Sequence, residues 1–87
     1  VSKAGLVQLT RVMARALAPD IRVACIAPGV VLPPEDATPE QIRQQRDRTP
    51  LRRLGSPADV ARALLFIVES DFLTGETVIL DGGRSLL

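Results

Sequence analysis

One uninterrupted apolar segment, IRVACIA at residues 21–27, limits the possible fold more than any other part of the chain. Apart from Arg22 at its start, the segment shows no alternation of polar and apolar residues. A strand with one solvated face alternates, so this pattern predicts a strand buried on both faces, as in a parallel sheet. Pro28 and Gly29 follow at once and end it sharply. Ligands of open α/β sheets bind at such carboxyl ends of strands.

A helix is expected before this strand, over residues 3–18, with Pro19 ending it. We see no start signal before Lys3, so we expect the helix to begin upstream of the chain. Its apolar face is wide, which is typical of a helix covered on more than one side. The apolar positions that define this face are Leu6, Leu9, Met13 and Leu17.

A second helix and strand are expected near the end of the chain. Ser56, Pro57 and Asp59 form a strong helix start, and TVIL at residues 77–80 reads as a second buried strand. The order helix–strand–flap helix–helix–strand predicts an α/β fold, the C-terminal portion of a doubly wound parallel (Rossmann) sheet. The predicted buried stripe of this last helix is Val60, Leu64, Ile67 and Val68.

Residues 30–55 between the two strand regions are polar and proline-rich. Thr38 and Gln41 form a capping box with Pro39 at the first helical position, which predicts a short helix over residues 39–48. Ile42 is the single apolar residue of this helix, so we expect a mobile flap that packs weakly.

The composition excludes several classes of protein. A net charge of +1 with interspersed signs gives no nucleic-acid footprint, and no apolar run is long enough to cross a membrane. The single cysteine, Cys25, is expected to be a small buried residue, which fits a cytoplasmic protein. We expect no metal site. The chain has no histidine and no tyrosine, so the usual acid–base groups are missing.

Four blocks in register carry a resemblance to a known family. They are SKAGLVQLTRVMARALA, IRVACIAPG, PLRRLGSPADVARALLFIVES and TGETVILDGG. In this order they resemble the C-terminal part of a short-chain dehydrogenase/reductase, and the resemblance covers essentially residues 1–87 as one fragment of a single domain. LPPE in the flap and DGGRSL near the end look similar to pteridine reductases, with β-ketoacyl-carrier-protein reductases as close relatives.

The resemblance implies an oxidoreductase that reduces a carbonyl or imine group with NADPH or NADH, NADPH being favoured. The family's catalytic motif is a tyrosine followed four residues later by a lysine, and Lys3 matches the lysine. The tyrosine would stand two positions before Val1, and the Gly-rich cofactor loop would also lie upstream. We therefore expect the 87 residues alone to be inactive.

The resemblance also implies a set of site residues. Lys3 would tune the tyrosine and bind the nicotinamide ribose, while Pro28 and Gly29 would lie against the nicotinamide. Val30 and Val31 would offer main-chain groups to its carboxamide.

Two positions depart from the family pattern. Ala24 stands where the family commonly has Asn, and Pro33 where it often has Thr, so the resemblance implies only main-chain contacts from this loop to the cofactor. Arg52 and Arg53 could meet an anionic substrate, but we expect them to face solvent.

The expected partners are a small carbonyl-type substrate and further copies of the chain in a homo-oligomer, a dimer or a tetramer. Neither nucleic acid nor membrane is expected. Two alternatives stay open: a non-catalytic structural or oligomerisation fragment, and a small binding module.

Overall fold

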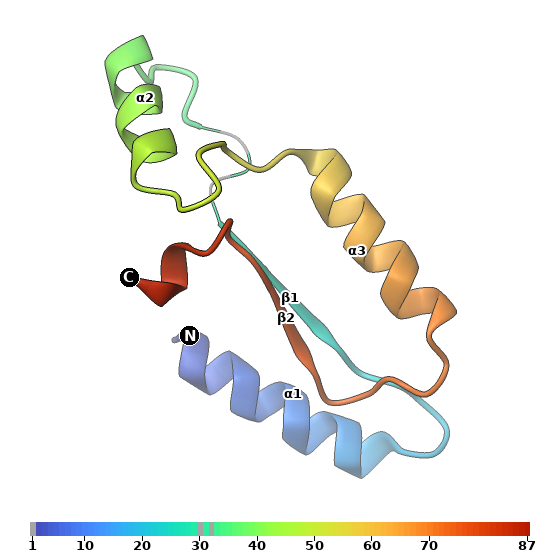
Figure 1. Cartoon of the computed structure of the whole chain (residues 1–87). Coiled ribbons are helices and arrows are strands. Elements are labelled where there is room, and N and C mark those ends of the chain that lie inside the picture. The colour runs from blue at the N-terminus through green and yellow to red at the C-terminus, as the bar shows by residue number, and fades with distance from the viewer. Residues whose placement is uncertain (1, 30, 32) are drawn as a thin grey trace.

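The computed structural model describes residues 2–29, 31 and 33–87. Figure 1 shows helices on both sides of a narrow sheet. The elements in chain order are α1 (Lys3–Leu17), β1 (Cys25–Pro28), α2 (Pro39–Asp47), α3 (Pro57–Glu69), β2 (Thr77–Leu80) and the short 3-10 helix η1 (Arg84–Leu86).

The two strands pair in parallel, as expected, with Cys25 opposite Thr77 and Pro28 opposite Leu80. β1 is shorter at its start than the predicted 21–27. The reason lies in the partner segment: the Val23 carbonyl accepts a hydrogen bond from the Gly75 N–H (2.7 Å), and Gly75 belongs to the bend before β2. Residues 21–24 are therefore held beside a loop and not beside a strand.

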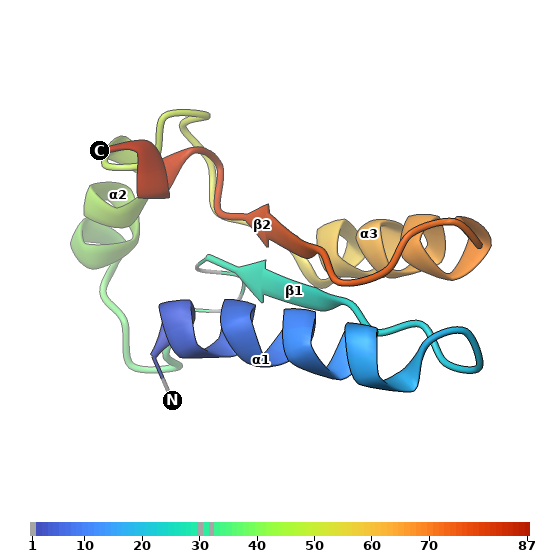
Figure 2. The ribbon, with the colours of Figure 1, turned by 90° about the horizontal axis from the view of Figure 1, so that it is seen from below.

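α1 and α3 lie on opposite faces of the sheet, so the molecule has three layers (Figures 1 and 2). This arrangement confirms the expected α/β class. α1 turns Thr10 and Ala14 toward the sheet, each only 4% exposed. These small side chains let the helix approach β1 closely. The larger apolar residues expected to define its buried face, Leu6, Leu9, Met13 and Leu17, all remain exposed to some degree.

The predicted stripe of α3 is only partly correct. Val60, Ala63 and Ile67 are half-buried, because these three positions face the two strands. Leu64 and Val68 are more than half exposed. A sheet of two strands is narrower than the apolar surface of the helix, and the remainder of that surface has no cover.

Both predicted helix starts are confirmed. The Ser56 hydroxyl accepts from the Asp59 N–H, and the Asp59 carboxylate accepts from the Ser56 N–H (2.8 Å). Thr38 and Gln41 form the same reciprocal pair at the start of α2. Within the described residues, no helix has the length and apolar character needed to cross a bilayer.

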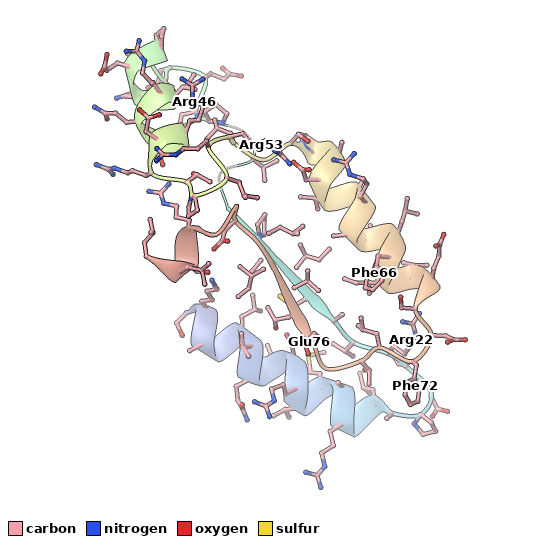
Figure 3. All side chains as sticks on the ribbon, viewed as in Figure 1. Arg22, Arg46, Arg53, Phe66, Phe72 and Glu76 are labelled. Carbon is pink, nitrogen blue, oxygen red and sulfur yellow. The ribbon has the colours of Figure 1, made fainter. Side chains whose placement is uncertain are left out.

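The end of α3 is held by Arg22, from the segment that precedes β1. Arg22 donates hydrogen bonds to the carbonyls of Ile67 (2.9 Å), Val68 (3.0 Å) and Ser70 (2.9 Å). Figure 3 shows Arg22 beside the last turn of α3. A cation at this position compensates the carbonyls that a helix end leaves without partners.

Candidate cofactor-binding site

Lys3 is the first residue of α1 and is exposed. We expected no start signal here, but Ser2 acts as the N-cap: its hydroxyl accepts from the Gly5 N–H at 3.0 Å. α1 runs alongside the sheet with its N-terminal end near the carboxyl ends of the strands (Figure 1). The helix therefore carries Lys3 to the edge where parallel sheets bind ligands.

Pro28 ends β1, and Gly29 leaves the sheet with its N–H donating to the Leu80 carbonyl (2.8 Å). A Cβ built on Gly29 would lie 2.9 Å from Cα and 3.1 Å from Cβ of Asp81. The sequence interpretation gave Gly29 the task of leaving room for a cofactor. The structure gives a further reason for glycine, because the backbone that follows β2 occupies the space of its missing side chain.

One hollow brings Lys3 together with the Pro28–Gly29 corner. We call it the lysine hollow. The side chains and backbone around it come from α1, the end of β1 and the turn after β2: Lys3, Ala27, Pro28, Gly29, Asp81, Arg84 and Ser85. Three predicted site residues thus line the same space. Val30 lies outside the described residues.

Asp81 is the acidic group of the lysine hollow. Its carboxylate accepts hydrogen bonds from the N–H groups of Gly83 and Ser85, both at 2.9 Å. Hydrogen bonds, first from the Ser85 side chain and then from these backbone groups, lower the pKa of Asp81, and the charge of Lys3 adds to the effect. The hollow therefore holds an ammonium and a carboxylate that is ionised at neutral pH.

A second hollow, the flap hollow, lies on the other side of the same strand ends. Val31 contributes to it with Gly29, and the rest of its wall comes from residues 49–55, the first turn of α3, the end of β2 and the turn that follows β2, including Arg84. Val31 is thus at the corner but does not line the lysine hollow.

Arg53 is exposed, as expected, and it also pairs with Asp59 at the rim of the flap hollow. The guanidinium donates to both carboxylate oxygens of Asp59 at 3.0 Å. This pair lowers the pKa of Asp59 well below its usual range, with help from Ser56. Arg52 donates to the Asp47 carbonyl (2.9 Å). The acceptors lie at the end of α2 and in the first turn of α3, five and six residues away, whereas both arginines lie in the loop between these helices, so no helical or strand spacing signals the pairs.

The turn after β2 contacts the end of the flap, which the sequence did not predict. The Leu51 N–H donates to the Gly82 carbonyl (3.0 Å), and Thr49 is 6% exposed. The Arg84 guanidinium donates to the side-chain oxygen of Gln45 on α2. The flap is therefore fixed at its carboxyl end. In the described part of the chain, no group of three or more potential metal ligands occurs.

Comparison with known proteins identifies the family. The family model described as Enoyl-(Acyl carrier protein) reductase matches residues 1–85. Carbonyl reductase family member 4 of Danio rerio is 44% identical over 99% of this chain and 36% of its own length. The chain belongs to the short-chain dehydrogenase/reductase family. The resemblance on which the site residues were chosen is thereby confirmed.

Other members of the short-chain dehydrogenase/reductase family also match this chain. The 3-oxoacyl-(acyl-carrier-protein) reductase FabG of Thermotoga maritima is 40% identical over 94% of this chain and 35% of its own. Among solved structures, FolM alternative dihydrofolate reductase 1 from Brucella suis, in complex with NADP, matches with a TM-score of 0.87 and 41% identity. That match covers 99% of this chain and 35% of the FolM chain.

A short-chain dehydrogenase from Leptospira borgpetersenii with bound NAD+ matches with a TM-score of 0.82 and 35% identity, over 95% of this chain and 33% of its own. The chain thus spans about a third of the length of the relatives it matches.

The residues of the lysine hollow suit the ribose and nicotinamide end of a dinucleotide. Lys3 offers a cationic donor for ribose hydroxyls. The Pro28–Gly29 corner offers an apolar surface at the end of a parallel strand, where the family's fold type binds such ligands. The residues present therefore fit a nicotinamide cofactor.

Proposed function

We propose that this chain is the C-terminal part of a single short-chain dehydrogenase/reductase domain, and that the complete protein is an NAD(P)-dependent reductase of a carbonyl or imine group. The observation that carries the proposal is the shared hollow, which gathers Lys3, Pro28 and Gly29 at the carboxyl end of β1. These residues come from separate elements, and the fold gives them one common space.

Lys3 acts through its charge. The family's tyrosine would lie one helical turn before Lys3 on the same face of α1, so the ammonium can reach both the phenol and a ribose hydroxyl. A nearby cation favours the phenolate and makes the tyrosine a better proton donor and acceptor near neutral pH. When bound, the nicotinamide supplies the hydride. Asp81 holds a negative charge beside Lys3 and limits the positive charge of the hollow.

We propose NADP as the preferred cofactor over NAD. FolM, whose structure holds NADP, is more similar to this chain than the Leptospira dehydrogenase with NAD+, at 41% against 35% identity. A carbonyl substrate follows from the resemblance to FabG and the carbonyl reductase, and an imine of the dihydropterin type from the resemblance to FolM.

The test is the replacement Lys3→Met in the complete protein, with NADPH oxidation measured against an acyl thioester ketone and a dihydropterin. We expect kcat/KM to fall by roughly 10²–10³, the usual loss when one preorganised donor is removed. Arg11→Met is the matched control, because Arg11 is exposed on the same helix, and it should leave the rate unchanged. A Lys3→Met enzyme with at least a tenth of the normal kcat/KM would refute the proposal.

A second candidate function is assembly without catalysis. It is favoured by the apolar surfaces of α1 and α3, which carry Leu9 at 49% and Phe66 at 62% exposure. We propose that these surfaces pack in a homo-oligomer, a dimer or a tetramer. For the 87 residues alone we expect no turnover, because the family's proton donor and phosphate loop are not among them.

A further inference from the structure

The C-terminal turn and the flap fit each other closely. Gly82 and Gly83 have positive φ angles of 65° and 92°, a conformation that favours glycine. A Cβ on Gly82 would lie 2.5 Å from Cγ2 of Thr49, and one on Gly83 would lie 3.1 Å from Cβ of Pro50. The glycine pair therefore does more than reverse the chain: it leaves space for the residues that end the flap.

α2 has few other means of attachment. Ile42 is its single apolar side chain and is only half-buried, and no residue of α2 is buried. Figure 1 shows α2 standing away from the two strands. Burial of apolar surface therefore contributes little to holding this helix in place.

Arg84 supplies the polar link between the two segments. Its guanidinium donates to the Gln45 side chain, a contact between residues 39 positions apart. In the described part of the chain the ion pairs join Asp59 to Arg53 and Arg62, and Arg84 takes part in neither. Arg84 is half-buried and lines both the lysine hollow and the flap hollow.

We propose that Arg84 is a positioning residue, which holds the carboxyl end of α2 on the C-terminal turn and so sets the substrate-binding shape of the flap hollow. The catalytic part of this inference rests on the proposed function; the structural part does not. Arg84 reaches the flap from the same turn that carries Asp81 into the lysine hollow. The turn after β2 therefore contacts the flap, which we place over the substrate, and also lines the lysine hollow, which we assign to the cofactor.

The structural test is amide hydrogen exchange in the complete protein carrying Arg84→Met. The Leu51 N–H, which donates to Gly82, reports whether the flap is docked, and the Gly29 N–H, which donates to Leu80, reports on the sheet. We expect Leu51 to exchange about tenfold faster, the effect of one hydrogen bond to a charged group on local opening. Gly29 should exchange at an unchanged rate. Equal acceleration at both amides, or none at Leu51, would overturn the proposal.

Matched variants distinguish the loss of the Arg84–Gln45 hydrogen bond from the general effect of removing a positive charge. Gln45→Met should reproduce the effect of Arg84→Met, and the double variant should add little, because both remove the same bond. Arg46→Met is the control: Arg46 is the next residue of α2 and is exposed (Figure 3). It should leave Leu51 protection unchanged. Additive effects of the two single changes would count against a direct link.

The catalytic readout is the division of the effect between KM and kcat. Arg84→Met should raise the KM of the carbonyl or imine substrate several-fold and leave kcat near normal, because a displaced flap weakens substrate binding. If the complete protein has no reductase activity, the proposed function fails, and the exchange rates still decide the role of Arg84. If kcat falls with an unchanged substrate KM, Arg84 does not act by positioning the flap.

Discussion

Gly29 illustrates what a single residue can and cannot reveal in the sequence. Its position after a buried strand correctly predicted a sharp corner, and the structure places it at the lysine hollow. The structure adds a reason for glycine that the sequence did not give, since Asp81 fills the adjacent space. Asp81 lies 52 positions further along the chain, and no local pattern predicts which backbone will pass so close.

Replacement of Gly29 by Ala should therefore destabilise the protein. The new Cβ would meet the backbone of Asp81 at 2.9 Å, and relief requires the strand ends to separate. We expect a loss of about 1–3 kcal/mol in the free energy of unfolding, the usual range for overpacking. Urea denaturation of the complete protein measures it. Gly5→Ala, on the exposed face of α1, is the control and should be neutral or slightly stabilising. An unchanged urea midpoint of unfolding for Gly29→Ala would show that the strand ends can separate without loss of stability.

Asp81 should report the charge of Lys3. The pKa of Asp81 is lowered by its hydrogen bonds to Ser85 and Gly83 and by Lys3. In Lys3→Met the pKa should rise part of the way toward its usual value, since the hydrogen bonds remain. Carbon-13 NMR titration of the Asp81 carboxyl measures the change, with Arg11→Met as the reference. The same Asp81 pKa in both variants would mean that the Lys3 ammonium lies too far away to interact.

Among the elements, the starts of α2 and α3 were predictable, whereas the N-cap of α1 at Ser2 and the end of α3 were not. The capping boxes at Thr38 and Ser56 lie within four consecutive residues, so the sequence shows both partners together. Arg22 meets the end of α3 across 45 to 48 positions. In the sequence it looked like an ordinary charged residue at the start of a strand.

Replacement of Arg22 by Ala should loosen the last turn of α3. Its hydrogen bonds to the carbonyls of Ile67, Val68 and Ser70 would be lost. Because Arg22 is exposed and water can replace part of the interaction, we expect a destabilisation of about 1–2 kcal/mol. Arg22→Lys should recover part of this, since Lys keeps the charge but not the fork of donors. Thermal unfolding compares the variants, and equal melting temperatures for wild type and Arg22→Ala would contradict the capping role.

The start of α3 should make stability depend on acid pH. The pKa of Asp59 is lowered in the folded state, first by Arg53 and then by Ser56. A carboxyl with a lowered folded pKa stabilises the protein above its unfolded pKa of about 3.9, and this stabilisation is lost as the pH falls further. Wild type should therefore be more stable than Asp59→Asn above about pH 5, and the difference should shrink below pH 4. Melting temperatures measured from pH 7 to pH 2.5 test this, and a constant difference would exclude the charge of Asp59 as its cause.

For the whole molecule, the sequence predicted the layers and the parallel pairing correctly. Periodicity identified which elements exist but not which apolar side chains are buried. The buried residues of α1 and α3 were predicted from the helical spacing of apolar positions alone. Burial also depends on how much sheet surface is available to cover each helix. With two strands, small residues such as Ala14 are buried while Leu64 and Phe66 stay exposed.

The exposed apolar surfaces predict how the isolated 87-residue chain will behave. Phe66, Phe72 and Leu65 are each more than half exposed, and surfaces of this kind cause association in water. We expect the chain alone to sediment as oligomers or to lack a cooperative unfolding transition, with the complete protein as the comparison. A monomer that unfolds sharply would show that two helices, two strands and a flap make a sufficient core without further chain.

Lys3 is the only lysine in the sequence, and it borders the lysine hollow. Reductive methylation with carbon-13 formaldehyde would therefore install one dimethylamine probe in these 87 residues besides any on the chain's terminal amine. Its methyl resonance would register each molecule that enters beside Pro28, with no need for turnover or a chromophore.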